Sequence, residues 1–332
     1  DFDRKTGLLK SNNLIHLNKE NSNEFVKDFD YQWIVSDVTE KPYSKSPPPP
    51  FITSTLQQAG ISKIRVSARQ IMSIAQKLYE NGYITYMRTD SINLSTEALN
   101  ASRSEIKNLY GDDYLPSKPI QYKSKVKNAQ EAHEAIRPAG AKFIHPDKLK
   151  SKLDKREYAL YNLIWSRTVA SQMNSAKLLT TKIEISNNNF IFQSKGKTIQ
   201  FDGYLKVYQD SKKDSDDVIL PKLIKGDNVK LIETEIKEHK TKPISRYTEA
   251  SLVKELETLG IGRPSTYASI ISTIINRGYV TRNKGTLIPT FTGFAVVKFL
   301  EKYFHQLINL QFTAEMEDKL DAISRSDKNH IS

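Results

Sequence analysis

Residues 82–91 (GYITYMRTDS) combine a tyrosine and an arginine at a spacing that suits phosphoryl transfer. The hydroxyl of Tyr86 can attack phosphorus, and the guanidinium of Arg88, two residues later, can hold phosphate oxygens in a bidentate fork. The run also contains Tyr83 and Asp90, a carboxylate that can either cap the loop or contact a ligand. Most of the 16 tyrosines in the chain must serve packing or the surface. Tyr86 is therefore a candidate nucleophile only because of the residues around it.

Positive charge gathers around this candidate site. The chain of 332 residues has 50 Lys plus Arg against 38 Asp plus Glu, which leaves a net charge of +12. Residues 51–170 hold 19 of the basic residues and 11 of the acidic ones, so this segment carries eight of the twelve excess charges. Such a field attracts polyanions, because phosphate contacts supply most sequence-independent affinity for nucleic acid. A basic surface that only keeps the protein soluble is the alternative.

Composition excludes several other classes of protein. The chain has no cysteine, so it forms neither disulfides nor cysteine-based zinc sites. No apolar run approaches the ~20 residues that a membrane span requires, and no secretory signal opens the chain. We expect a cytoplasmic protein without a membrane partner. The first residue is Asp1 rather than methionine, which we interpret as the interior of a longer protein.

Two predicted helices position the tyrosine. Ser67 and Gln70 form a capping-box pattern, and apolar residues follow at helical spacing, namely Ile71, Ile74, Ala75 and Leu78. Gly82 suits the left-handed end of this helix. Residues 83–93 then provide a short extended piece and a loop, before Ser95 caps a second helix that runs to about residue 109. Helices on both sides should hold the tyrosine more firmly than a free loop would.

A second constellation lies in residues 130–138 (QEAHEAIRP). His133 and Arg137 are four residues apart, so on a helix they would share a face and could contact one phosphate. Taken by itself the pair is a weak signal, and an ordinary surface helix end is the better interpretation. Residues 156–173 form an apolar helical run that we predict to be core.

The segments on either side of this helical region predict antiparallel β structure. Residues 31–38 are rich in aromatic and β-branched side chains, and the proline run at 47–50 reads as a stiff connector. Between 178 and 236 the pattern alternates, with short strands predicted at 181–185, 190–192, 199–201 and 229–232 and turns at 187–189, 195–197 and 211–217. We predict an α+β multidomain protein in which residues 1–50 and 171–245 form a discontinuous β arch. Residues 51–170 would be a helical domain inserted into it.

The last third predicts a winged-helix-like domain at 246–332. Thr248 caps one helix and Gly260 ends it. A second helix starts near Pro264, and a small β piece follows at 278–290. The start of the second helix brings free backbone amides together with Arg263, Ser265 and Thr266, which is a natural phosphate site.

Four motifs, in the same order, resemble type IA DNA topoisomerases. They are residues 51–58 (FITSTLQQ), 82–91, 131–138 (EAHEAIRP) and the pair 246–256 (RYTEASLVKEL) and 260–268 (GIGRPSTYA). The resemblance covers nearly the whole chain and is closest to the bacterial topoisomerase I subgroup. It places the nucleophile at Tyr86 rather than Tyr83, and it implies a location at the bacterial nucleoid.

The resemblance implies an ATP-independent relaxation of negatively supercoiled DNA through a 5′-phosphotyrosine intermediate, on single-stranded regions of the duplex. Arg88 would stabilise the phosphate and the phenolate. Asp90, His133, Arg137, Arg246, Thr248, Arg263, Ser265 and Thr266 would contact DNA. Members of the family bind Mg²⁺ in an N-terminal acidic domain that these residues lack, and some carry a zinc-ribbon tail. We therefore expect no metal site in this chain, a monomer, and a fragment that binds single-stranded DNA but is inactive alone.

Other interpretations stay open at this point. Tyrosine recombinases also use a tyrosine nucleophile, but they place it after their arginine and histidine elements, whereas Tyr86 precedes His133. A non-catalytic clamp for single-stranded DNA is a further possibility. Within the family, the topoisomerase III and reverse gyrase subgroups are alternatives.

Overall fold

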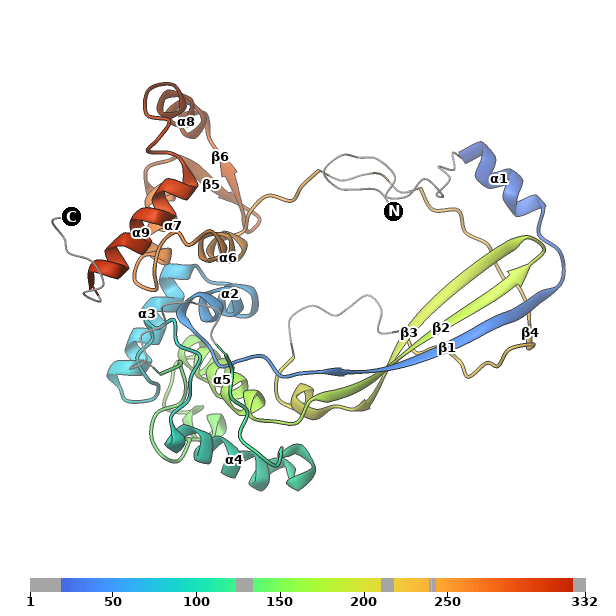
Figure 1. Ribbon diagram of the computed structural model, residues 1–332, viewed down its shortest axis with the longest axis horizontal. Helices are drawn as coiled ribbons and strands as arrows, with labels where there is room; N and C mark the ends of the chain where they lie inside the picture. Colours follow the sequence, from blue (N-terminus) through green and yellow to red (C-terminus); the bar gives the residue numbers. More distant parts are fainter. Residues whose placement is uncertain (1–18, 124–133, 210–217, 239, 241–242, 325–332) are drawn as a thin grey trace. The chain divides into compact units, whose positions relative to one another are not determined.

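The structure, a computed structural model, describes residues 19–123, 134–209, 218–238, 240 and 243–324. Contacts between Cα atoms group these residues into two compact units. The first lies within residues 1–45, 175–202 and 212–245, and the second within residues 46–174, 203–211 and 246–332. Figure 1 labels the helices and strands of both units. In the part of the chain that is described, no helix is long and apolar enough to cross a membrane.

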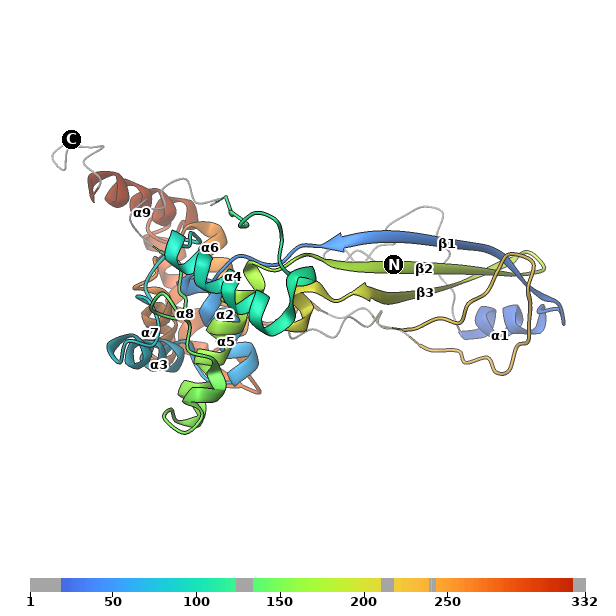
Figure 2. The same ribbon diagram turned by 90° about the horizontal axis from the view of Figure 1, so that it is seen from below.

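The first unit is built on an antiparallel sheet with the strand order β3-β2-β1-β4. The strands are β1 (Trp33–Lys45), β2 (Ala176–Asn187), β3 (Phe190–Phe201) and β4 (Asn228–Val229). β1 and β2 lie far apart in sequence but pair along their whole length, from Ile34 opposite Ser186 to Lys45 opposite Ala176. Figure 2 shows β1, β2 and β3 side by side. The β segments predicted before and after the helical region thus share one sheet.

β3 is a single strand where the sequence predicts two. The turn predicted at 195–197 does not form, and residues 190–201 continue opposite β2. Gly196 instead marks a close approach, since a Cβ at this position would lie 2.4 Å from the carbonyl oxygen of Val218. The turn predicted at 187–189 is confirmed, and Asn188 adopts a φ of 50° there.

An aromatic cluster covers one face of the sheet at the end where β1 and β3 begin. α1 (Lys19–Lys27) leads into Phe29, whose ring meets those of Trp33, Phe190 and Phe192 edge-on at centroid distances of 5.4, 5.6 and 5.3 Å. Alternate residues of a strand point to the same side, so Phe190, Phe192 and Gly196 share this face. We call it the covered face of the sheet.

The helices around Tyr86 belong to the second unit. They are α2 (Thr53–Ile64), α3 (Ala68–Glu80), α4 (Thr96–Tyr110) and α5 (Lys155–Ser171), with short 3₁₀ helices at Asp112–Tyr114, Pro146–Leu149 and Gly203–Lys206. The predicted starts of α3 and α4 are confirmed, because Ser67 and Gln70 form a capping box and Ser95 caps α4. α5 packs against the other three helices and buries Leu160, Tyr161 and Ile164.

Residues 246–324 continue the same unit. α6 (Glu249–Leu259) and α7 (Tyr267–Asn276) precede a two-stranded sheet of β5 (Val280–Asn283) and β6 (Thr286–Pro289), followed by α8 (Phe291–Tyr303) and α9 (Leu310–Ser324). Thr248 caps α6 and Gly260 ends it with a φ of 72°, as predicted. α7 begins at Tyr267 and not near Pro264, because the hydroxyl of Thr266 accepts the amide of Arg263 and closes a turn first. The sequence analysis predicts neither α8 nor α9.

Contacts between α2 and α6 join the segment 246–324 to the helices that frame Tyr86. The hydroxyl of Ser54 donates to Glu257 at 2.5 Å, and the amide of Ala68 donates to the buried carboxylate of Glu249 at 2.9 Å. Ala68, Val253, Tyr267 and Ile271 form one buried apolar cluster. The two segments that the sequence analysis treats as separate domains lie in one compact unit.

Candidate active site

The segment that carries Tyr86 leaves α3 through Gly82, whose φ is 71°. The next residues are extended and pair with residues 135–139 through backbone hydrogen bonds, from Thr85 N to Arg137 O and from Ala139 N to Tyr83 O, each at 2.9 Å. Ile84 and Pro138 form a β-bridge. The helix expected at 130–138 is therefore wrong for residues 134–138, because the backbone groups of this stretch are used in pairing with the tyrosine segment.

Thr53, the first residue of α2, holds the other end of the segment. Its fully buried hydroxyl donates to the carbonyl of Met87 at 2.8 Å and accepts the amide of Thr89 at 2.9 Å. Its own amide donates to the carbonyl of Thr89 at 2.9 Å. Backbone donors and acceptors of residues 83–89 are thus fixed on both sides of Tyr86.

This anchoring sorts the side chains of the segment into two sets. Met87, Thr89 and Ser91 point inward and are buried. Tyr86 and Arg88 point outward, and the side chain of Tyr86 is 46% exposed. The alternation is confined to residues 86–91, because Ile84, two residues before Tyr86, is buried. The residues that the sequence analysis assigns to chemistry therefore lie together on the exposed side of a fixed strand-like segment.

Tyr86 and Arg88 are in contact. A guanidinium nitrogen of Arg88 lies 3.5 Å from the phenol oxygen of Tyr86, a long hydrogen bond between two exposed side chains. The ring of Tyr79, at the end of α3, meets the ring of Tyr86 edge-on with 5.2 Å between centroids. A phosphate that approaches the phenol oxygen can therefore meet the guanidinium at the same time.

Tyr83, the other candidate in the segment, lies in a different environment. Its side chain is half-buried, and its ring packs edge-on against that of the buried Tyr161 at 6.3 Å. Burial raises the pKa of Tyr161 far above its usual range, as expected for a phenol within the core. Tyr83 thus contributes to packing, and Tyr86 is the more exposed of the two residues.

Arg137 is almost fully buried, and its guanidinium binds protein acceptors. It donates to both oxygens of Glu134 at 2.8 and 3.0 Å, and to the carbonyls of Pro138 and Gly140 at 2.9 and 3.2 Å. Glu134 in turn accepts the amide of Ser95 at 2.8 Å. Burial alone would raise the pKa of Glu134, but the hydrogen bonds from Arg137 and Ser95 outweigh it and lower the pKa. The sequence analysis did not single out Glu134. His133, which it paired with Arg137, lies outside the described residues.

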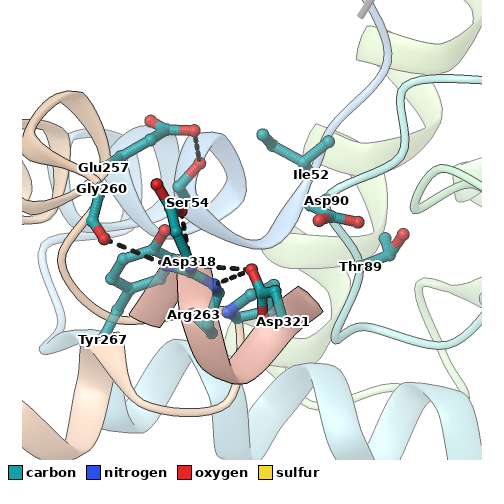
Figure 3. Close-up of a pocket in the computed structure, with 11 residues that line it drawn as sticks. Ile52, Ser54, Thr89, Asp90, Glu257, Gly260, Arg263, Tyr267, Asp318 and Asp321 are labelled. Atoms are coloured by element: carbon teal, nitrogen blue, oxygen red, sulfur yellow. Dashed lines mark hydrogen bonds and ion pairs between the residues drawn. The ribbon is translucent and has the colours of Figure 1, made fainter. Parts of the chain in front are cut away.

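A small cavity of about 150 Å³ brings two of the predicted site residues together, Asp90 and Arg263 (Figure 3). Asp90 and Thr89 lie on one side of it, and Glu257 and Gly260 on the other. Burial, reinforced by the nearby carboxylate of Glu257, raises the pKa of Tyr267 to about 12, so its phenol remains a hydrogen-bond donor at neutral pH. The cavity is lined by Ile52, Ser54, Thr89, Asp90, Glu257, Gly260, Arg263, Pro264, Tyr267, Asp318 and Asp321.

The guanidinium of Arg263 is held by carboxylates of α9. It donates to Asp321 through two nitrogens at 3.0 and 2.8 Å, and to the carbonyls of Gly260 and Gly262 at 3.1 and 2.8 Å. Asp318 lies 3.4 Å away. The sequence analysis did not find Asp318 and Asp321, because nothing local connects them to a residue more than fifty positions earlier.

The remaining predicted residues lie at the starts of α6 and α7. Arg246 and Ser265 are exposed. The hydroxyl of Thr248 is used as a helix cap, since it accepts the amide of Ser251 at 3.1 Å. Thr266 accepts the amide of Arg263 at 2.7 Å. The two exposed residues are therefore the ones whose side chains point to solvent in the described structure.

Metal-ligating side chains do not cluster in this region. No group of three or more His, Cys, Asp or Glu side chains that could hold a metal ion occurs within residues 19–123, 134–209, 218–238, 240 and 243–324. Two carboxylates around the cavity accept hydrogen bonds instead, Glu257 from Ser54 and Asp321 from Arg263.

Comparisons with known proteins agree with the motifs. A family model described as DNA topoisomerase matches residues 3–332. DNA topoisomerase 1 of Mycobacterium tuberculosis is 48% identical over 339 residues, which cover 98% of this chain and 36% of the relative. DNA topoisomerase 1 of Streptomyces coelicolor is 47% identical over 343 residues, covering 100% and 36%. The chain thus spans little more than a third of these relatives.

A solved structure is similar over the same range. The full-length topoisomerase I of Thermotoga maritima superposes with a TM-score of 0.83 at 36% sequence identity. The match covers 99% of this chain and 55% of the Thermotoga chain. Both units of the structure are therefore represented in a solved relative.

Proposed function

The chain belongs to the bacterial type IA DNA topoisomerase family, and on that premise we propose that Tyr86 is the nucleophile with which the full-length protein cuts and rejoins one DNA strand. The phenol oxygen attacks a backbone phosphorus, the bond from phosphorus to the 3′ oxygen breaks, and the 3′ oxygen leaves with a proton. The product is a 5′-phosphotyrosyl link and a free 3′-hydroxyl. Reversal of the step reseals the strand, so relaxation of negatively supercoiled DNA needs no ATP.

The observation that carries the proposal is the setting of the Tyr86 hydroxyl. It is exposed, it lies on a backbone segment fixed at both ends, and it contacts the guanidinium of Arg88 at 3.5 Å. A nucleophile held in one geometry avoids much of the entropic cost of reaction. Tyr83, which packs against the core, offers less access to a substrate as large as DNA.

We propose that Arg88 stabilises the negative charge that develops on the phosphate and on the phenol oxygen. Phenols are protonated at neutral pH, so the attack also requires an acceptor for the phenol proton. Removal of one donor to a developing oxyanion typically costs about 3 kcal/mol of transition-state stabilisation. Arg88 is the cationic side chain in contact with the reacting oxygen.

We further propose that DNA runs from Tyr86 toward the cavity of Figure 3. Arg246 and Ser265 are exposed for contacts with phosphates, and the phenol of Tyr267 can donate to one. Arg263 and Thr266 can shape this surface through the turn between α6 and α7. Thr248 would act through the start of α6, which it caps. Arg137 would act by positioning the tyrosine segment, since its donors face Glu134 and backbone carbonyls.

The resemblance also implies Mg²⁺, and the described residues do not fit such a site. Mg²⁺ prefers octahedral oxygen ligands, often one or two carboxylates with several waters, and in the described ranges no group of three or more His, Cys, Asp or Glu side chains could hold a metal ion. We propose that the full-length protein binds Mg²⁺ outside residues 1–332. None of the steps above depends on its position.

The test is covalent capture of a labelled single-stranded oligonucleotide by the full-length protein, resolved on a denaturing gel. Tyr86→Phe should abolish the adduct and leave the dissociation constant for DNA within about twofold, because only the nucleophilic oxygen is lost. Tyr83→Phe is the matched control and should retain the adduct. An adduct in Tyr86→Phe at the wild-type level would move the nucleophile elsewhere, and a wild-type protein that binds DNA without any adduct would favour a non-catalytic clamp.

A further inference from the structure

A row of lysines crosses one face of the sheet in the first unit. Thr180 of β2 lies directly between Lys41 of β1 and Lys197 of β3. One step along the same face, Lys182 lies directly opposite Lys195. Directly opposed residues share a face, as do alternate residues of one strand. We call the surface defined by Lys41, Lys182, Lys195 and Lys197 the lysine face.

The lysine face is the side of the sheet opposite to the covered face. Phe190, Phe192 and Gly196 of β3 point to the covered face, so the intervening Lys195 and Lys197 point away from it. Lys41 and Lys195 are exposed, and Ile199, two residues beyond Lys197, is 54% exposed. A ligand can therefore reach Lys41 and Lys195.

The positive charge on this face is only partly neutralised within the protein. Lys182 pairs with Glu184 at 2.5 Å, and Asp37, which lies directly opposite Glu184, adds a second carboxylate to this face. Among the described residues, no carboxylate lies within ion-pair distance of Lys41 or Lys195. Lys195 lies directly opposite Lys182 and, unlike Lys182, has no carboxylate partner among the described residues, so its charge is open to an anionic ligand.

Protection of a sheet edge accounts for only part of the arrangement. Lysines are common on edge strands because they block pairing with other chains. Lys195 and Lys197 lie on the edge strand β3, and Lys41 lies on a part of β1 that β4 does not pair, because β4 pairs only with Trp33 and Ile34. Lys182 lies on β2, which is paired on both sides, so the row of lysines crosses the sheet and is not confined to its edges.

We propose that the lysine face binds the phosphodiester backbone of DNA, as a contact separate from the Tyr86 segment of the second unit. The proposal rests on the proposed function for its ligand. The lysines form a grid with about 4.8 Å between strands and about 7 Å between alternate residues along a strand. Flexible ammonium groups on such a grid suit a continuous row of phosphates, without recognition of base sequence. Binding through this face should therefore be strongly salt-dependent.

The experiment compares salt dependence of DNA binding between two double variants of the full-length protein. Lys41→Gln/Lys195→Gln removes two charges from the lysine face. Lys177→Gln/Lys222→Gln is the matched control, because neither lysine belongs to the lysine face. Leu178 lies two residues from Thr180 and shares the lysine face, so the adjacent Lys177 points to the covered face. Lys222 follows the segment that approaches Gly196 on the covered face. All four side chains are exposed. Fluorescence anisotropy with labelled duplex and single-stranded probes gives the affinity at each NaCl concentration.

The loss of two phosphate contacts should reduce the slope of log K against log salt by about 1.8 for duplex or about 1.4 for single-stranded DNA. At 0.1 M NaCl this corresponds to about 60-fold or about 25-fold weaker binding. The control should show less than a third of either change. The probe with the larger loss identifies which form of DNA occupies the face. Thermal melting checks that both variants fold, as substitution of exposed lysines by glutamine should allow.

Each outcome decides the proposal independently of the function of Tyr86. Equal slopes of log K against log salt for the lysine-face variant and its control would overturn the proposal. Displacement of DNA from the wild type by poly-glutamate at equal charge would also overturn it and would point to an acidic protein partner. Adduct formation at saturating oligonucleotide, measured in the same samples, should be unchanged in both variants. Loss of the adduct in the wild type would refute the role of Tyr86 and leave the comparison of slopes intact.

Discussion

Replacement of Thr53 by valine should slow the reaction of Tyr86, although Thr53 makes its hydrogen bonds to Met87 and Thr89 and not to Tyr86. Valine has nearly the same shape, but it lacks the hydroxyl that bonds the carbonyl of Met87 and the amide of Thr89. Both groups would then lie unpaired in a region where Thr53 has no exposed surface. Each unpaired buried group costs about 1 to 3 kcal/mol, so the pair costs about 2 to 6 kcal/mol. If the segment relaxes to recover these bonds with water, the reactive geometry becomes a minor state, and adduct formation slows at least about 30-fold.

The assay is the single-turnover rate of adduct formation by the full-length protein, with thermal melting measured in parallel. Thr53→Ser keeps the hydroxyl and should react at close to the wild-type rate. Thr168→Val controls for stability alone, because Thr168 is also fully buried and, among the described residues, its hydroxyl bonds only the carbonyl of Ile164 in α5. If Thr53→Val reacts as fast as the wild type, or no more slowly than Thr168→Val, the hydrogen bonds of Thr53 do not position the nucleophile.

Three further predictions follow from named contacts. Arg88→Ala should slow adduct formation about 100-fold, with Arg88→Lys intermediate because it keeps the charge but loses the bidentate fork; equal rates for Lys and Arg would show that charge alone suffices. The pKa of Glu134 is lowered in the folded state, so the carboxylate stabilises the fold above its unfolded pKa of about 4.5 and this contribution is lost as pH falls through the lower folded value. Glu134→Gln should accordingly reduce the melting temperature at pH 7 and converge with the wild type once the pH falls below the lowered folded pKa of Glu134. A difference that persists in strong acid would contradict the ion pair with Arg137. Arg263→Ala should weaken the attachment of α9 by about 1 to 2 kcal/mol, seen as faster amide exchange in that helix, and Asp321→Asn should show a smaller effect in the same direction; unchanged exchange in both would exclude this contact.

The sequence by itself determined the features that depend on neighbouring residues. The capping box of Ser67 and Gln70, the cap at Ser95 and the left-handed end at Gly260 each involve groups within four positions, and the structure confirms all three. Motif order then sufficed to identify the family, because four separate motifs match it in sequence.

Features that depend on distant contacts could not be predicted. Gly196 is compatible with a turn or with a close approach, and only the position of Val218 decides for the second. Residues 134–138 have an acceptable helical pattern, but their backbone groups pair with residues 83–85 about fifty positions earlier. In both places a weak local preference is outweighed by partners that the sequence does not reveal.

The same distinction applies to the charges of the site. Arg137, Arg263 and Arg88 are alike in sequence as candidates for binding phosphate. In the tertiary structure Arg137 donates to Glu134 and backbone carbonyls, and Arg263 donates to Asp321. Arg88 is exposed beside the phenol of Tyr86. A guanidinium brought into a partly buried position must find acceptors there, because an unpaired buried charge is far more costly than one in water. Which arginine keeps its donors for a substrate is therefore decided by where the fold places carboxylates.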